Sequence, residues 1–183
     1  MRPEVEERIL DIGGFEGPWE RMGLLDRVTV VNLDPGGDHK TRFVQADGTA
    51  LPFTAKSFGL VYSNSVIEHV GDFVDQRQLA EEIRRVGQRY WVQAPDRSFP
   101  IEPHFLFPGF QLLPLRARLW IGPRWPISWP RQFGWTRARI EAEIRELRLP
   151  TARELQALFP EGVLYYERFI GLTKSLVVHS TVD

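Results

Sequence analysis

Three aspartates each stand at the end of a short apolar run, and their spacing suggests a shared binding site. Asp11, Asp34 and Asp47 belong to three successive runs that have the composition of buried strands. Because the carboxyl ends of parallel strands meet at one edge of a sheet, these carboxylates are expected to face one crevice. Such a crevice would bind a ligand that carries amines, hydroxyl groups or a positive charge.

A glycine-rich turn follows the first aspartate. Gly13, Gly14 and Gly17 come directly after the run that contains Asp11, and glycine lets a backbone approach a ligand through dihedral angles that side chains disfavour. The turn lacks the G-x-G-x-x-G pattern that binds a pyrophosphate through bare amides at a helix N-terminus. The carboxylate of Asp11 before the turn fits a ligand that bears an amine or a positive charge. An ordinary strand-to-helix turn is the alternative interpretation of the glycines.

The other two aspartates suit a nucleoside. Asp34 comes 23 residues after Asp11, close to the separation at which nucleotide-binding folds place an acid that accepts both ribose hydroxyl hydrogens. Asp47 could accept a hydrogen bond from the exocyclic amine of an adenine. Since Asp34 also begins a plain turn sequence, Asp-Pro-Gly-Gly, the three acids together indicate more than any one of them.

Among the four histidines, His104 is the best candidate for a general base. It follows the predicted fifth strand, and an imidazole that titrates near neutral pH can take a proton from a hydroxyl group. His69 is more typical of a structural residue, and no role is assigned to His39 or His179. Because the chain has no cysteine and no H-x-x-x-H pattern, no dedicated metal site is predicted.

Alternating strands and helices must position these residues. Short apolar or β-branched runs between turn residues predict the strands, which are residues 9–12, 28–33, 43–47, 60–63 and 90–94. A closing antiparallel hairpin is expected at residues 163–168 and 174–179. The predicted fold class is therefore α/β: a Rossmann-like, mostly parallel sheet with helices on both faces and a C-terminal antiparallel hairpin.

The helices are predicted from apolar residues at helical spacing and from capping residues. They pass through residues 19–25, 72–86 and 140–147, and one more begins at the capping-box pattern Thr151-x-x-Glu154.

A segment rich in proline, tryptophan and arginine follows the fifth strand. Residues 95–130 hold eight of the 14 prolines, and residues 91–135 hold five of the six tryptophans. Between residues 103 and 140 there are six arginines and no acid. Disordered linkers are poor in aromatic residues, so residues 96–150 are expected to form an ordered, irregular cap that walls a pocket.

Length and composition limit the class of protein. The 183 residues predict one domain over residues 1–183, and the formal net charge of -1 gives no overall attraction to nucleic acid. The absence of cysteine fits a reducing compartment. No apolar run approaches the ~18 residues that span a bilayer, and a cytoplasmic location is expected.

Taken in order, these motifs resemble those of one family. They are residues 10–17 (LDIGGFEG), Asp34, residues 46–53 (ADGTALPF) and residues 57–70 (SFGLVYSNSVIEHV). They resemble the class I S-adenosylmethionine-dependent methyltransferases, most closely the small-molecule, type 11-like branch. The resemblance spans residues 9 to 95, and the closing hairpin is similar to the final strands of the family. It implies S-adenosylmethionine as the cofactor.

The resemblance also implies a role for each matching position. The first aspartate and the glycine turn would lie along the methionine part of the cofactor, the second aspartate would bind the ribose, and the third would border the adenine. Two residues after the fourth strand would line the floor beneath the sulfonium. The implied cofactor-binding residues are Asp11, Gly13, Gly14, Gly17, Asp34, Asp47, Gly48, Ser63 and Asn64.

Three features depart from the family pattern. Phe15 stands where the middle glycine of D-x-G-x-G-x-G is expected, and Gly59 replaces a common aspartate. The chain also begins close to its first strand, whereas relatives carry one or two upstream helices that help to cover the cofactor. The expected fold is a minimal, open version, or one whose cover comes from the irregular segment or from a partner.

The expected activity is methyl transfer from S-adenosylmethionine to a small-molecule or lipid- or sugar-linked acceptor, at oxygen and by in-line displacement. Two other functions stay open. One is a non-catalytic, methyltransferase-like scaffold or partner-binding domain, and the other is an NAD(P)-dependent oxidoreductase on a similar fold.

The basic, aromatic composition of the cap favours an anionic or amphipathic acceptor. It also predicts peripheral membrane contact through residues 105–135, because tryptophan and arginine are favoured at a lipid headgroup boundary. A cap that merely covers the end of the sheet is the alternative. Nucleic acid is not an expected partner, and the oligomeric state is left open.

Overall fold

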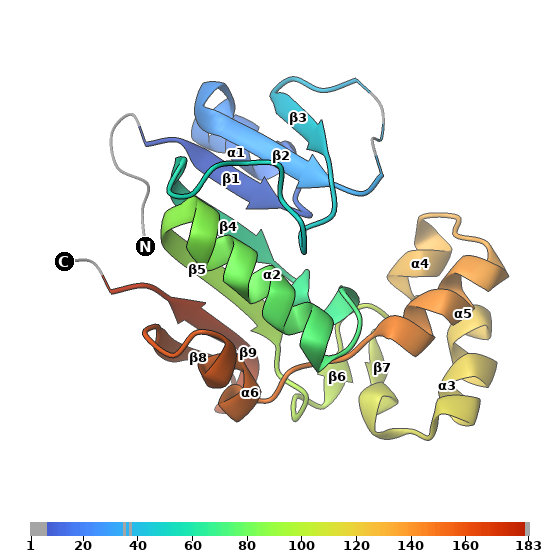
Figure 1. Cartoon of the computed structure of the whole chain (residues 1–183). Helices are drawn as coiled ribbons and strands as arrows, with labels where there is room; N and C mark the ends of the chain where they lie inside the picture. Colours follow the sequence, from blue (N-terminus) through green and yellow to red (C-terminus); the bar gives the residue numbers. More distant parts are fainter. Residues whose placement is uncertain (1–6, 35, 37, 182–183) are drawn as a thin grey trace.

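A seven-stranded sheet forms the centre of the computed structural model, which describes residues 7–34, 36 and 38–181 (Figure 1). The strand order is β3-β2-β1-β4-β5-β9-β8. The strands β1 to β5 run parallel to one another. Strand β9 pairs antiparallel with β5 on one side and with β8 on the other. This sheet and its closing hairpin confirm the predicted fold class.

The strand positions agree closely with the prediction, and the main differences lie at the strand ends. The predicted third strand stops at Gln45, so Asp47 lies in the turn that follows it. The bounds are β1 Ile9–Ile12, β2 Val28–Asn32, β3 Arg42–Gln45, β4 Phe58–Asn64, β5 Gly87–Pro95, β8 Val163–Phe169 and β9 Leu172–His179.

Side-chain alternation along the strands divides the sheet into two differently covered faces. From β1, Leu10 and Ile12 point into the larger core, which α2 (Phe73–Val86) and α6 (Ala152–Leu158) complete. Ile9 points to the opposite face, where it packs with Trp19 of the short helix α1 (Gly17–Met22). The strand therefore sends the side chain of Asp11 to the α1 face.

Capping residues explain where the helices begin and end. The predicted helix over residues 19–25 ends earlier, at Met22, because Gly23 adopts a left-handed conformation with φ of 68°. A short 3-10 helix, η1 (Leu25–Arg27), follows it. The capping box at Thr151 is present as predicted and starts α6, and Asp72 caps α2 in the same way.

The segment between β5 and α6 is ordered and has a small core of its own, built on Phe105, Phe110, Ile140 and Ile144. Figure 1 shows its short helices to one side of the carboxyl ends of the parallel strands. Its elements are β6 Ile101–Glu102, β7 Phe107–Pro108, η3 Phe110–Leu112, α3 Leu115–Ile121, η4 Gly122–Arg124, α4 Trp129–Gln132 and α5 Arg137–Glu146. We call residues 96–150 the cap. Within the described part of the chain, no helix is both long and apolar enough to cross a membrane.

Candidate functional site

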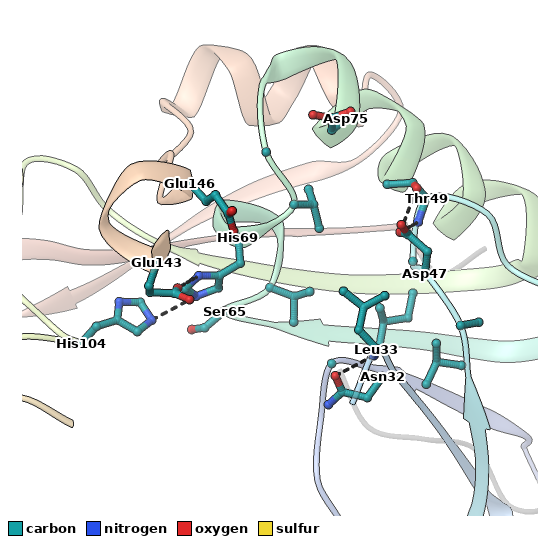
Figure 2. A pocket seen from close by; sticks show the side chains of 18 of the residues that line it. Asn32, Leu33, Asp47, Thr49, Ser65, His69, Asp75, His104, Glu143 and Glu146 are labelled. Atoms are coloured by element: carbon teal, nitrogen blue, oxygen red, sulfur yellow. Dashed lines mark hydrogen bonds and ion pairs between the residues drawn. The ribbon is translucent and has the colours of Figure 1, made fainter. Parts of the chain in front are cut away.

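A cavity of about 750 Å³ opens where the carboxyl ends of β1, β2 and β4 meet the cap (Figure 2). This is the edge at which open α/β sheets bind ligands. The sheet side is lined by Ile12, Gly13, Val31, Asn32, Leu33, Ala46, Asp47, Gly48, Thr49, Ser65 and Val66. The cap side is lined by His104, Trp129, Pro130, Phe133, Trp135, Glu143 and Glu146, with His69, Val70, Gly71 and Asp75 between the two sides.

The glycine turn after β1 leaves no space for side chains. Gly13 has φ of +68°, and a Cβ atom there would lie 2.6 Å from Cγ2 of Val66. At Gly14 a Cβ atom would lie 1.9 Å from Oδ2 of Asp11. Both positions therefore require glycine, and the backbone of the turn can approach a ligand closely.

Asp11 is a buried acid with an incomplete set of partners. Its side chain is 2% exposed, and Trp19 Nε1 donates a hydrogen bond to Oδ2 over 2.6 Å. Among the described residues, Oδ1 has no hydrogen-bond partner. Burial raises the pKa of Asp11 to about 7, although the bond from Trp19 acts in the opposite direction. An amine would satisfy the unpaired oxygen.

Asp47 and Gly48 line the cavity, and their position beside an adenine stays a prediction. Oδ1 of Asp47 accepts hydrogen bonds from both the backbone nitrogen and the hydroxyl of Thr49, each over 2.8 Å, which fixes the turn after β3 (Figure 2). A Cβ atom on Gly48 would lie 2.9 Å from Cδ1 of Leu79. The backbone of this turn thus packs directly on the core beside the cavity.

The three aspartates do not line one cavity, contrary to the sequence-based expectation. Of the three, only Asp47 borders the 750 Å³ cavity. Asp11 instead borders a smaller cavity of about 380 Å³ on the α1 face, which Gly13 also borders. Asp34 is exposed, and its Oδ1 accepts a hydrogen bond from Gly36 over 3.0 Å. The end of β2 reaches the main cavity through Asn32 and Leu33.

The remaining predicted cofactor residues have different surroundings. Ser63 is fully buried in β4, and Asn64 borders the smaller cavity together with Gly14. Gly17 is the first residue of α1. The serine that reaches the main cavity is Ser65, one residue beyond the end of β4. Strand alternation does not separate Ser63 from Ser65, because positions two apart share a face, and the roles of all these residues stay predictions.

Two histidines meet at the cap end of the cavity. His69 comes from the 3-10 helix η2 (Ile67–His69), and His104 follows β6. Their Nε2 atoms are 3.2 Å apart, as the dashed line between the two rings in Figure 2 shows. Sequence reasoning missed the pair and assigned His69 a structural role. The two residues are 35 positions apart, so no local pattern connects them.

Carboxylates surround both imidazoles. Nδ1 of His104 is 2.5 Å from Oε1 of Glu102, and Nδ1 of His69 is paired with Oε1 of Glu143. Burial by itself would lower the pKa of His104, but the bond to Glu102 and the negative charges of Glu102, Glu68 and Glu143 raise it. The cap therefore supplies His104, Glu102 and Glu143 to this end of the site.

Glu68 is the most unusual group in the cluster. Its side chain is completely buried, and burial raises its pKa. In the part of the chain that the structure describes, neither of its carboxylate oxygens has a hydrogen-bond partner. Oε1 is 3.9 Å from Nε2 of His69. A buried carboxylate in this state needs a cation, a proton or a donor.

Comparison with known proteins gives one domain match and many structural likenesses. Residues 15–89 match the model of a methyltransferase domain. No curated protein sequence matches the chain.

Three solved structures illustrate the structural likeness. An S-adenosylmethionine-dependent methyltransferase from Methanosarcina mazei is 15% identical, with a TM-score of 0.55 over 98% of this chain and 95% of that chain. One from Mesorhizobium loti is 16% identical, with a TM-score of 0.56 over 98% and 92%. The 1,6-didemethyltoxoflavin-N1-methyltransferase of Burkholderia thailandensis is 15% identical, with a TM-score of 0.57 over 97% and 70%. At these identities the likeness concerns the fold.

Proposed function

We propose that this chain methylates an oxygen atom of a small amphipathic acceptor. Its matching domain and its fold support membership of the class I S-adenosylmethionine-dependent methyltransferase superfamily. The observation that carries the proposal is one cavity that joins a glycine-lined end at the sheet to an aromatic, histidine-containing end in the cap. The cofactor of the superfamily is S-adenosylmethionine, which supplies a methyl group on a positively charged sulfonium.

The glycine-lined end fits this cofactor. Gly13 and Gly48 line this end of the cavity and carry no side chain, so a flat or extended ligand can lie against their backbone. Asp47 stands where an adenine edge is expected. Asp11, with its unpaired oxygen, borders the smaller cavity that Gly13 also borders, so it would meet only an amine of the ligand that extends past Gly13. These residues, with Asn32 and Leu33 at the end of β2, would hold the cofactor.

The aromatic end supports an acceptor with an apolar part. Trp129 and Phe133 line the cavity and are nevertheless 54% and 70% exposed, so the cavity wall continues onto the surface of the molecule. Arg131, which lies between them in α4, is exposed as well. An apolar group with a nearby negative charge matches this mouth.

Oxygen is the proposed methylated atom because hydrogen-bonding side chains gather where the acceptor would lie. The ring of His104 is fixed by Glu102 at Nδ1, and its Nε2 faces His69. A hydroxyl group at this end would find nitrogen and carboxylate acceptors for its proton. Placement in line with the transferred methyl group then supplies most of the rate enhancement.

Calorimetric titration with S-adenosylmethionine and S-adenosylhomocysteine tests the cofactor part of the proposal. We expect binding in the micromolar range, weakened at least tenfold in Asp47→Ala, since a lost charged hydrogen bond costs about 1.5–3 kcal/mol. Asp26→Ala is the matched control, because Asp26 is exposed and borders none of the three cavities described. Binding of a nicotinamide cofactor instead would favour the oxidoreductase alternative.

An acceptor screen tests the catalytic part. Release of S-adenosylhomocysteine is measured with hydroxyl compounds that carry an apolar chain and a negative group, beginning with glycosylated and lipid-linked metabolites. Mass spectrometry with fragmentation then locates the added methyl group. Cofactor binding without turnover on any acceptor class would favour the scaffold alternative.

A further inference from the structure

The cluster around His69 and His104 has the arrangement of a metal-binding site. One ring nitrogen of each histidine and one carboxylate oxygen of Glu68 all lie within 4.8 Å of one another, and Nε2 of His69 is 3.2 Å from Nε2 of His104 and 3.9 Å from Oε1 of Glu68. The two rings meet edge to face, at an interplanar angle of 89°. Each of the three side chains thus directs one potential ligand atom towards the same small volume.

The hydrogen bonds on the far side of each ring determine which nitrogen is available. A carboxylate can only accept, so Glu102 and Glu143 favour a proton on Nδ1 of His104 and on Nδ1 of His69, respectively. In the neutral rings the lone pairs are then on the two Nε2 atoms, which face each other over 3.2 Å. Two facing lone pairs repel, so this contact needs either a proton on one Nε2 atom or a metal ion that both Nε2 atoms bind.

Glu68 provides independent support for a cation. Its carboxylate is completely buried, and both oxygens lack hydrogen-bond partners among the described residues. Together with Glu102 and Glu143, it brings three carboxylates to two imidazoles. Buried charges in proteins are paired or coordinate a metal, and a divalent cation would balance most of this negative charge.

We propose that Nε2 of His69, Nε2 of His104 and the carboxylate of Glu68 bind one divalent transition-metal ion at the cap end of the cavity. Tetrahedral Zn²⁺ with Zn–N distances of 2.0–2.1 Å holds two nitrogens about 3.3 Å apart, close to the 3.2 Å between the two Nε2 atoms. In the same geometry a carboxylate oxygen would also lie about 3.3 Å from each nitrogen, so Oε1 of Glu68, now 3.9 Å from Nε2 of His69, must move closer.

The surrounding groups match a metal site in two further respects. Glu102 and Glu143 accept from the second nitrogen of each ligating ring, as carboxylates do around many protein-bound metals. The donor set of two imidazoles and one carboxylate suits Zn²⁺, Mn²⁺, Fe²⁺ or Co²⁺ better than Mg²⁺ or Ca²⁺, which prefer oxygen ligands throughout.

The position of the metal specifies the chemistry of the acceptor. His69 and His104 both line the cavity, so a fourth coordination position directed into it would take an oxygen of the acceptor. With its Nε2 atom on the metal, His104 would act as a ligand in place of a proton acceptor, and the metal would lower the pKa of the bound hydroxyl group. This part of the inference rests on the proposed function, whereas metal binding itself does not. The acceptor class becomes hydroxyl compounds whose oxygen can bind a divalent metal.

Metal titration of the chelator-treated protein tests the site without cofactor or acceptor. We expect the purified chain to bind about one Zn²⁺ ion, by calorimetry and elemental analysis, and to give the visible absorption of four-coordinate Co²⁺ when Co²⁺ replaces it. His104→Ala and His69→Ala should lose both signals. Glu143→Gln should weaken Zn²⁺ affinity by about 10- to 100-fold, since it removes only the partner of a ligand.

Two controls keep the outcome decisive. His179→Ala removes a histidine of β9 that lies outside the cluster, and its metal binding should be unchanged. Glu68→Gln has nearly the same shape and should lower the affinity for Zn²⁺ while circular dichroism and S-adenosylhomocysteine binding stay normal.

No Zn²⁺ binding, or binding that survives in both histidine variants, would overturn the proposal and favour a proton shared between the rings. Loss of the cofactor signal with intact metal binding would instead count against the proposed function alone.

Discussion

Asp11 places an acid with a raised pKa inside the folded chain, and this couples stability to pH. Its pKa of about 7 in the folded protein lies above the ordinary value of 3.8, so the folded state holds the proton more tightly than the unfolded state. The destabilisation therefore grows as pH rises from about 4 to 7 and is constant above that range, reaching the order of 4 kcal/mol.

We expect Asp11→Asn to abolish this loss of stability. In urea denaturation the variant should be more stable than the parent at pH 8, with a difference that shrinks towards pH 5. Asp26→Asn, at an exposed position, should show no such trend. Equal pH dependence in Asp11→Asn and the parent would contradict the assignment of the titrating group to Asp11.

Gly13 and Gly109 allow two effects of a side chain to be separated. Both have φ of +68°, but a Cβ atom at Gly13 would meet Val66 at 2.6 Å, whereas nothing lies within 4 Å of one at Gly109. Gly109→Ala should cost about 1 kcal/mol through backbone strain alone, and Gly13→Ala roughly 1–3 kcal/mol more through overpacking. Thermal unfolding measures both, and similar losses in the two variants would contradict the steric argument.

At the scale of secondary-structure elements, α2 positions the histidine-bearing turn through one buried side chain. Nε2 of Gln76 donates to the carbonyl oxygen of Ile67 over 3.0 Å and to that of Arg148 over 2.8 Å, and Arg148 Nη1 donates back to Oε1 of Gln76 over 2.6 Å. These bonds connect α2, η2 and the end of the cap. The position of His69 therefore depends on a buried side chain of α2 that does not itself line the cavity.

Replacement of Gln76 tests this connection. Gln76→Leu leaves two carbonyl groups and Nη1 of Arg148 without the partner that Gln76 supplies, whereas Nη2 of Arg148 keeps Glu154. The change should cost about 1–3 kcal/mol for each group left unsatisfied. Gln78→Leu is the control in the same helix, since Gln78 is exposed and should change stability by no more than about 0.5 kcal/mol. Equal unfolding free energies of the two variants would show that the bonds of Gln76 contribute nothing.

At the scale of the whole molecule, the cap presents apolar side chains to solvent near its arginines. Leu112 is 71% exposed and Trp120 is 64% exposed, and Arg124 lies over the ring of Trp120 at 5.3 Å. We propose that this surface contacts anionic membranes, because apolar and cationic side chains together favour the headgroup region.

Liposome flotation checks the membrane proposal. The chain should float with vesicles that contain anionic lipid and stay in the soluble fraction with neutral ones. A double variant, Leu112→Ser with Trp120→Ser, should lose most of the floated fraction. Ile170→Ser, at a hairpin position that is 85% exposed, should behave like the parent. A parent that never floats with anionic vesicles shows that the surface has another role.

The sequence by itself determined the features that depend on neighbouring residues. The strands, the hairpin that closes the sheet and the beginning of α6 were all predictable, because short apolar runs between turn residues and the capping residues Thr151 and Glu154 act within a few positions. The glycine turn after β1 was equally readable, since its backbone conformation is a local requirement at Gly13.

Only the tertiary structure decided which chemical groups share a cavity. It directed Asp11 and Asp47 to different cavities, because alternation in β1 turns one side chain to the α1 face. It also brought His69 and His104 into contact across 35 positions of sequence. That contact exists because the cap packs over the ends of the strands, and packing between distant segments leaves no periodic pattern or fixed spacing in the sequence.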